Sequence, residues 1–241
     1  MDLARSPEDY ARWVVNTPPP VAEARPRRSC FICATPRCGS WFLSGLLAST
    51  GLAGRPHEWF WRDTRSGLER AWDVRSEEAY IELVLAAGTT PNGVFGAKVM
   101  WGMLPDLSPF PDPRFVWLRR RDRVAQAVSF AKAVQTGHWH SWDPEPHAQP
   151  SYRFEELDAL RREIDELERG WERWFERQGL EPLELAYEEV VASPESETLR
   201  VLDFLSVELP SEVSIKPLTL PGSDGVDGEW QARYRRELAE L

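Results

Sequence analysis

Short apolar runs alternate along the chain with longer stretches in which apolar residues recur every three or four positions. Runs of strand length occupy residues 29–34, 93–101, 114–120 and 183–187. Helical spacing occupies residues 40–50, 76–88, 122–136, 155–178 and 193–205. Strands that alternate with helices over short links are typical of βαβ units. The pattern therefore predicts an α/β fold with a mainly parallel central sheet flanked by helices.

The longest predicted helix, residues 155–178, carries a single apolar stripe. The stripe consists of Leu157, Leu160, Ile164, Leu167, Trp171, Trp174 and Phe175. Spacing of three and four places these side chains on one helix face, which is typical of a face packed on a core. We therefore interpret its two tryptophans as core residues rather than as a ligand site.

Capping and proline signals set the beginning of the chain apart from the rest. Ser6 precedes Pro7 and two acidic residues, which predicts a helix from Pro7 to Val15. Residues 17–28 are rich in proline and show no periodicity. We expect residues 1–28 to form an N-terminal helix and arm, and residues 29–241 to form a single domain that ends in a helix.

The composition limits the classes of partner. A chain of 241 residues suits one α/β domain. A net charge of −10 disfavours general nucleic-acid binding, which depends on neutralising phosphates. No stretch approaches the ~18 apolar residues that span a membrane, and the first residues contain no apolar leader, so the cytoplasm is the expected location.

Three cysteines, Cys30, Cys33 and Cys38, fall within nine residues. An odd number in one segment does not indicate a disulfide framework. On a strand, Cys30 and Cys33 would point to opposite faces, which disfavours a shared metal or redox pair. We expect buried thiols in a reducing compartment, and no metal site is predicted here or at the His138-x-His140 pair.

The stretch "CFICATPRCGSW" predicts a strand that leads through a loop into a helix. Such a loop offers backbone N–H groups and the positive end of the helix dipole to an anion. In it, Pro36 shapes the turn, Gly39 lets the backbone approach closely, and Arg37 and Ser40 supply a fixed charge and a hydroxyl. The Gly-x-x-x-x-Gly-Lys-Ser/Thr pattern of ATP and GTP binders is absent. An ordinary turn between strand and helix is the alternative interpretation.

A second cationic feature lies in "WLRRRDRVAQAVSF". Arg119, Arg120 and Arg121 stand where a core strand leaves the sheet, and Ser129 follows on the next helix. Ligands of such sheets bind beyond the carboxyl ends of the strands. A solvated run of charges is the alternative, but two separated anion sites would suit a ligand with phosphates at both ends.

These features together resemble the bacterial trehalose 2-sulfotransferase-like family. The stretches that carry the resemblance are "TPRCGSWFLSGLLASTGLAGRPHEWF", "TPNGVFGAKVMW", "RRRDRVAQAVSFAKAVQT", "LELAYEEVVASPESETLRVLDFL" and "EWQARYRRE", which run in this order from Thr35 to Glu237. The resemblance implies a P-loop-like sulfotransferase fold. It also implies the donor 3′-phosphoadenosine 5′-phosphosulfate (PAPS), which leaves as adenosine 3′,5′-bisphosphate, and no metal. Members are often dimeric, so a homodimer is one assembly to test.

The resemblance also implies roles for individual residues. The loop that would hold the 5′-phosphosulfate consists of Thr35, Pro36, Arg37, Cys38, Gly39, Ser40 and Trp41. Arg120 and Ser129 would hold the 3′-phosphate, with Arg121 as a neighbouring candidate. Glu58, in a Gly-x-Pro-x-Glu motif that begins at Gly54, matches the glutamate that serves as the base, and Arg37 would stabilise charge on the leaving phosphate.

The chemistry of Glu58 can also be argued from the residues. An acceptor hydroxyl must lose a proton as it attacks sulfur, and a carboxylate within reach can take it. Burial beside Trp59, Phe60 and Trp61 would raise the pKa of that carboxyl. A surface carboxylate paired with Arg55 or Arg62 is the alternative interpretation, and His57, His138 and His140 are alternative bases.

The acceptor is the least determined part of the prediction. A carbohydrate or other small molecule is expected against a set of aromatic and polar side chains, namely Trp59, Phe60, Lys98, Trp101, His138 and Trp139. Lys98 would reach the donor sulfate or the acceptor, or would extend to solvent as strand-end lysines do.

Three positions depart from the family pattern, and they keep two other functions open. Cys38 and Trp41 replace hydroxyl-bearing residues, and Pro221 replaces an arginine. A non-catalytic protein that binds a 3′-phosphonucleotide would be compatible with these losses. A small-molecule P-loop kinase is disfavoured by the missing Lys-Ser/Thr.

Overall fold

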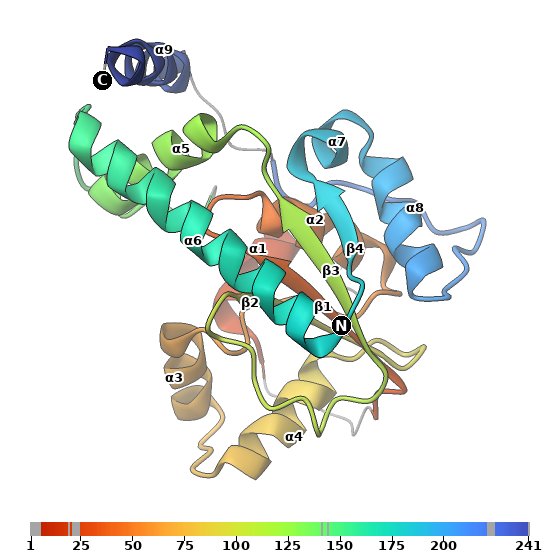
Figure 1. The fold of residues 1–241 in the computed structure, drawn as a ribbon. Coiled ribbons are helices and arrows are strands. Elements are labelled where there is room, and N and C mark those ends of the chain that lie inside the picture. Colours follow the sequence, from red (N-terminus) through yellow and green to blue (C-terminus); the bar gives the residue numbers. More distant parts are fainter. Residues whose placement is uncertain are drawn as a thin grey trace.

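The computed structural model describes residues 6–18, 20, 25–140, 142–143, 145–220 and 225–240. Its centre is a four-stranded sheet in the order β2-β1-β3-β4 (Figure 1). The strands are β1 (Arg28–Ala34), β2 (Val94–Met100), β3 (Pro113–Arg119) and β4 (Leu183–Ala186). Every neighbouring pair is parallel, with Phe31 of β1 opposite Ala97 of β2 and Phe115 of β3. The parallel sheet that the alternating pattern predicted is therefore confirmed.

Helices cover both faces of this sheet. They are α1 (Pro7–Asn16), α2 (Ser40–Thr50), α3 (Arg62–Ala71), α4 (Glu77–Gly88), α5 (Arg123–Thr136), α6 (Phe154–Gln178), α7 (Tyr187–Ala192), α8 (Pro194–Phe204) and α9 (Gly225–Ala239). None of the helices in the described part of the chain is long and apolar enough to cross a membrane.

The two faces of the sheet bury separate hydrophobic clusters. Side chains of a strand alternate between faces. Phe31 and Cys33 of β1 accordingly pack with α1, α3, α4 and α6, whereas Cys30 and Ile32 pack with α2 and α8. All three cysteines are buried and free, and burial raises the pKa of Cys30 to about 12. The expected separation of Cys30 from Cys33 is confirmed.

The long helix α6 crosses the first of these faces (Figure 1). Leu157, Ile164, Trp171 and Phe175 of the predicted stripe are buried, and Trp171 Nε1 donates a hydrogen bond to the carbonyl oxygen of Ala34, 3.0 Å away. Trp171 is therefore core, as predicted, and the half-buried Trp174 packs against the same cluster. At the other end of α6, Trp230 and Tyr234 of α9 pack against α5 and α6 in a third cluster.

The N-terminal helix α1 packs directly on the domain. Tyr10 and Trp13 are buried in the cluster of the first face, and His57 Nε2 donates to the carbonyl oxygen of Val14 at 2.9 Å. Residues 19 and 21–24 of the proline-rich segment that follows α1 lie outside the described residues. The division of the chain after residue 28 stays a prediction.

Two helices were not predicted from the pattern. Helix α3 buries only Leu68, so its sequence lacks the apolar stripe by which helices are recognised. Helix α7 is six residues long and follows β4 without a linker.

Candidate active site

The loop between β1 and α2 has a backbone that only certain residues can adopt. Arg37 and Gly39 have φ angles of 60° and 91°, in the left-handed region. A Cβ atom on Gly39 would lie 2.1 Å from Cδ2 of Tyr187, the first residue of α7. Glycine at position 39 therefore permits both the turn and the close approach of the Tyr187 ring.

The loop presents backbone N–H groups at the beginning of α2. The N–H of Cys38 donates to the carbonyl oxygen of Thr35, and those of Phe42 and Leu43 donate to Gly39. The N–H groups of Ser40 and Trp41 precede the first backbone hydrogen bond of the helix, so they are not used within it. This arrangement suits an anion, which the positive end of the helix dipole attracts.

A cavity of about 1000 Å³ opens beside this loop, beyond the carboxyl ends of the strands. It brings together most of the residues that the sequence predicted for the site: Pro36, Arg37, Gly39, Ser40, Trp41, Glu58, Lys98, Trp101, Arg120, Ser129, His138 and Trp139. Five predicted residues do not line it, namely Thr35, Cys38, Trp59, Phe60 and Arg121. The two anion sites that the sequence predicted therefore lie in the same cavity as Glu58.

One end of the cavity holds two guanidinium groups, which we call the arginine pair, Arg37 and Arg120. Arg37 Nε donates to Ser129 Oγ at 3.0 Å, and Arg37 Nη1 donates to the carbonyl oxygen of Trp139. Arg120 Nη1 lies 3.4 Å from the carbonyl oxygen of Arg37, and its Cζ stacks 4.8 Å from the Tyr187 ring centroid. The two predicted anion sites are therefore joined through the contact between Arg37 and Ser129.

The arginine pair has no carboxylate in direct contact among the described residues, although Asp143 and Asp227 act on Arg37 from further away. Neither guanidinium forms an ion pair with a carboxylate among the described residues, and Arg120 Nε is buried without a hydrogen-bond partner there. Burial and the neighbouring charge of Arg120 lower the pKa of Arg37. Cations held together in this way would be stabilised by an anionic ligand.

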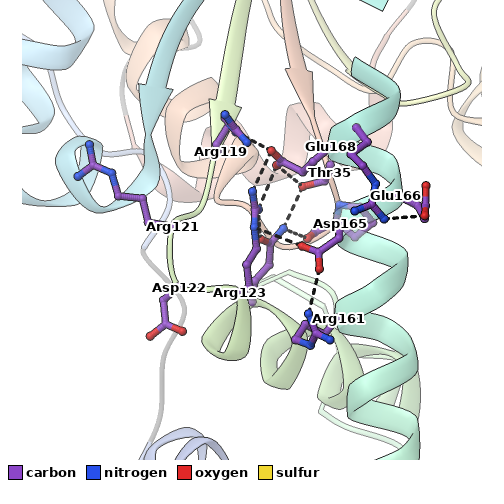
Figure 2. Close-up of polar contacts among 12 residues, drawn as sticks. Thr35, Arg119, Arg121, Asp122, Arg123, Arg161, Asp165, Glu166 and Glu168 are labelled. Atoms are coloured by element: carbon purple, nitrogen blue, oxygen red, sulfur yellow. Dashed lines mark hydrogen bonds and ion pairs between the residues drawn. The ribbon is translucent and has the colours of Figure 1, made fainter. Parts of the chain in front are cut away.

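The neighbours of Arg120 in the sequence point elsewhere (Figure 2). Arg119 Nε lies 2.6 Å from Glu168 Oε2. Arg121 is exposed, and it pairs with Glu189 while its backbone N–H donates to Glu188. The structure therefore does not bring Arg121 to the cavity, because its side chain is directed to the surface.

Behind the loop lies a buried polar network, the Glu168 cluster, which consists of Thr35, Arg119, Arg123, Gln126 and Glu168 (Figure 2). Glu168 is 4 % exposed and also pairs with Arg123 Nη2 at 2.9 Å. Thr35 Oγ1 donates to Glu168 at 3.4 Å and accepts from Gln126 Nε2 at 2.9 Å, while Gln126 also donates to the carbonyl oxygen of Pro36. Thr35 thus supports the loop from behind and does not face the cavity.

At the other end of the cavity, Glu58 forms an ion pair with Lys98, with 2.7 Å between Oε1 and Nζ. Burial is the largest single effect and raises the pKa of Glu58. The charge and hydrogen bond of Lys98, together with the neighbouring His57 and His140, outweigh it, so the pKa lies below its ordinary value. The expectation of a raised pKa is wrong, because the buried ammonium of Lys98 lies beside the carboxylate and favours its ionised form. Neither Arg55, which donates to Ala87, nor Arg62 is the partner of Glu58.

Lys98 does not extend to solvent. Its side chain is 0 % exposed, and Nζ lies 3.7 Å from the ring centroid of Trp41. The tryptophan that the sequence marked as a departure thus covers the lysine.

The histidines differ in their access to the cavity. His57 is buried against α1, and burial lowers its pKa to about 4. His140 lines the cavity, lies 3.1 Å from Asp143 Oδ1 and stacks on Trp142 with 4.8 Å between ring centroids. In the described part of the chain, no group of three or more His, Cys, Asp or Glu side chains is arranged to hold a metal ion.

Two predicted acceptor residues lie in the core. Trp59 is 0 % exposed, donates through Nε1 to the carbonyl oxygen of Gly96, and stacks on His57. Phe60 packs on Phe110 with 5.9 Å between ring centroids. They therefore support Glu58 without reaching the cavity.

Other residues line the cavity that sequence reasoning did not select. Tyr187 directly follows the fourth strand, and its place at the carboxyl edge of the sheet could have revealed it. Lys132 lies one helical turn beyond Ser129 and pairs with Asp227 at 2.8 Å. Its position three residues after Ser129, on the same helix face, is the sequence feature that could have revealed it.

Comparison with known proteins supplies a family. The sequence profile described as "Stf0 sulphotransferase" matches residues 29–111 and 108–237. A trehalose 2-sulfotransferase of Mycobacterium tuberculosis (strain Erdman) is 30 % identical over an alignment of 264 positions. The alignment covers 90 % of this chain and 98 % of that protein. A trehalose 2-sulfotransferase of Mycolicibacterium smegmatis is 28 % identical over 252 residues, which cover 86 % and 94 %.

Solved structures agree in fold. The crystal structure of a sulfotransferase from Alicyclobacillus acidocaldarius superimposes with a TM-score of 0.51 at 17 % identity, covering 90 % of this chain and 94 % of that one. At this identity the likeness concerns the fold alone, and it confirms the predicted sulfotransferase architecture.

Proposed function

This chain belongs to the Stf0 sulphotransferase family and is a sulfotransferase enzyme, and from that premise we propose its donor, acceptor class and base. The donor is PAPS, the acceptor is a hydroxyl group of a carbohydrate or other small molecule, and Glu58 is the base. One observation carries the proposal: a single cavity joins the arginine pair, which has no carboxylate partner among the described residues, to the buried carboxylate of Glu58.

The residues at the cationic end fit a nucleotide with two anionic groups. Arg37, Arg120 and Ser129 offer charge-assisted hydrogen bonds, and the N–H groups of Ser40 and Trp41 offer backbone donors. The buried Nε of Arg120, without a partner in the described residues, supports a ligand there, because such a group is costly to leave unsatisfied. When bound, PAPS supplies an activated sulfuryl group.

The chain's own residues would handle charge and proton. As the acceptor oxygen forms its bond to sulfur, the bond from sulfur to the phosphate oxygen breaks and adenosine 3′,5′-bisphosphate leaves. Glu58 takes the proton of the acceptor hydroxyl on a carboxylate oxygen. Arg37 stabilises the negative charge that grows on the leaving phosphate. By analogy with phosphoryl transfer, positioning and charge neutralisation supply most of the catalysis.

The acceptor is a carbohydrate in this proposal, and trehalose is the first to test, because two similar proteins are named trehalose 2-sulfotransferases. Trp101, His138 and Trp139 line the cavity, and Trp139 is 38 % exposed. Exposed indole faces pack well on the C–H surfaces of sugars, with polar tips left for hydroxyl groups.

Thermal stabilisation by nucleotides tests the donor. A ligand that binds only the folded state adds about 2.7 kcal/mol of stability at a hundredfold excess over its Kd. Adenosine 3′,5′-bisphosphate should raise the Tm more than AMP or ATP does, and Arg120→Ala should remove the difference. An equal shift with ATP would contradict the assignment of the 3′-phosphate to Arg120.

Transfer of sulfate from PAPS to trehalose and to a panel of other sugars tests the reaction. Glu58→Gln should reduce kcat by about 10²–10⁴ while the Tm shift with adenosine 3′,5′-bisphosphate remains. The exposed carboxylate in Glu212→Gln serves as the matched control. Full activity in Glu58→Gln would assign the base to another residue.

A further inference from the structure

Glu58 and Lys98 form an isolated ion pair in the described part of the chain. Among the described residues, each of the two is the other's only ion-pair partner. Both residues line the cavity, but the side chain of Lys98 is 0 % exposed and that of Glu58 is 17 % exposed, so the carboxylate is the more accessible group. The backbone is joined as well, since the N–H of Lys98 donates to the carbonyl oxygen of His57 at 2.9 Å.

Trp41 fixes the ammonium on its other side. The centroid of its ring lies 3.7 Å from Nζ, which is a cation–π contact. The indole is itself held edge-on by four rings, those of Tyr10, His57, His140 and Trp142. A tryptophan at this position thus gives the buried lysine a cation–π contact, which a hydroxyl-bearing residue could not supply.

We propose that Lys98 is a positioning residue that holds Glu58 as an ionised carboxylate directed into the cavity, with the indole of Trp41 excluding water from the pair. This inference rests on the proposed role of Glu58 as the base. It assigns to Lys98 an action through Glu58, rather than contact with donor or acceptor.

The surroundings of Glu58 decide whether its carboxyl group is protonated or ionised. A carboxyl group that is buried alone takes up a proton, whereas a cation in contact with it favours the ionised form. Other ionisable groups face the pair: Tyr10, Arg37, Cys38, His57 and His140. Only Lys98 lies within ion-pair distance of Glu58 among the described residues.

Lys98 makes Glu58 a weaker base but keeps a larger fraction of it in the ionised form that can accept a proton. Lys98 lowers the proton affinity of Glu58, which weakens the individual proton transfer. In return, Glu58 is ionised across neutral and mildly acidic pH. After Glu58 takes a proton, Lys98 is a buried cation without a counter-charge, and this favours release of the proton to solvent.

The pH dependence of kcat/KM tests the inference. Because the pKa of Glu58 is lowered, the wild-type activity should persist into mildly acidic solution. Without the cation, burial raises that pKa. The pH below which kcat/KM falls should therefore be higher in Lys98→Met than in the wild type. We expect the loss of kcat/KM at about pH 6 to exceed the loss at about pH 9 by about tenfold or more.

Matched variants separate this effect from a general structural one. Lys216→Met removes an exposed lysine and should leave the profile unchanged. Lys98→Arg keeps the charge and should retain the wild-type acidic limb even where its rate is lower. Loss by an equal factor at every pH in Lys98→Met would overturn the inference.

Folding and function can fail separately. The Tm shift with adenosine 3′,5′-bisphosphate reports whether Lys98→Met folds. If it does not, Lys98→Gln, which can still donate a hydrogen bond, carries the pH test. If neither folds, Glu58→Gln with Lys98→Met should recover the Tm, and no recovery would overturn the pairing.

Full activity in Glu58→Gln would refute the proposed base. An inactive Glu58→Gln with an unshifted pH profile in Lys98→Met would refute only the role of Lys98.

Discussion

Two groups of arginines lie on opposite sides of the loop between β1 and α2. In the Glu168 cluster, Arg119 and Arg123 both pair with one buried carboxylate, which also holds Thr35. In the arginine pair, Arg37 and Arg120 hydrogen-bond to a hydroxyl and to carbonyl oxygens and contact no carboxylate among the described residues. The residue type is the same, but only the first group is paired with a carboxylate of the protein, and we propose that the second binds the ligand.

This difference teaches that the partner of an arginine, rather than its charge, indicates its role. Arg119, Arg120 and Arg121 are consecutive, yet they reach a buried acid, the cavity and the surface in turn. Successive side chains at a strand end point in opposite directions, so one run of charges serves three purposes. The comparison can be tested by removing members of each group.

The largest effect is expected at Arg37. Arg37→Ala should lower kcat/KM for sulfate transfer by about 10³, because a charged donor to the leaving phosphate is lost. The Tm without ligand should change little, since no ion pair is broken. Arg37→Lys should recover only part of the activity, because an ammonium lacks the planar fork. A large loss of Tm with unchanged kcat/KM would place Arg37 with the structural group.

The reverse outcome is expected at Glu168. Glu168→Ala leaves Arg119 and Arg123 without their shared counter-charge and Thr35 without its acceptor, so it should cost about 3 kcal/mol of unfolding free energy. Denaturant unfolding measures this loss. Glu168→Gln, which keeps an acceptor, should lose less, and an unchanged stability in both variants would remove the distinction between the two groups.

A smaller effect is expected at Arg120. Arg120→Ala should weaken binding of adenosine 3′,5′-bisphosphate about 10²-fold in calorimetry, while binding of AMP changes less. The stability of the unliganded protein should stay the same or rise slightly, because the repulsion between Arg120 and Arg37 is removed. A clear loss of stability would show that Arg120 supports the fold.

The smallest effect is expected at Arg121. Its side chain is 65 % exposed and pairs with Glu189 on the surface. Arg121→Ala should change the unfolding free energy by less than about 1 kcal/mol and should leave nucleotide binding within about twofold of the wild type. A binding loss as large as that of Arg120→Ala would mean that Arg121 also serves the ligand.

The sequence was most informative where local pattern determines structure. The helix expected over residues 40–50 is α2, because its apolar spacing and the glycine at position 51 fix both ends. Helix α3 escaped prediction because its packing involves one buried residue, Leu68. The loop between them contains Glu58, whose motif could be matched to a family although its surroundings could not.

Long-range contacts are what the sequence did not reveal. Lys98 is forty positions from Glu58 and meets it only because β2 binds the backbone of His57, so the direction of the pKa change was predicted wrongly. Trp59 follows Glu58 directly but points into the core. The role of Trp41 was equally hidden, since Trp41 lies on α2 and the lysine beneath it comes from β2, far away in the sequence.

Helix α1 has a consequence for the modularity of this enzyme. It precedes the segment that the family profile covers, yet Tyr10 and Trp13 are buried against Trp41 and Trp59, on the side of the core that supports Glu58. A chimera that exchanges residues 29–237 for those of a relative would therefore inherit an aromatic wall without the helix shaped to fit it. We therefore expect substitutions in α1 and in this aromatic wall to be tolerated only in matched combinations.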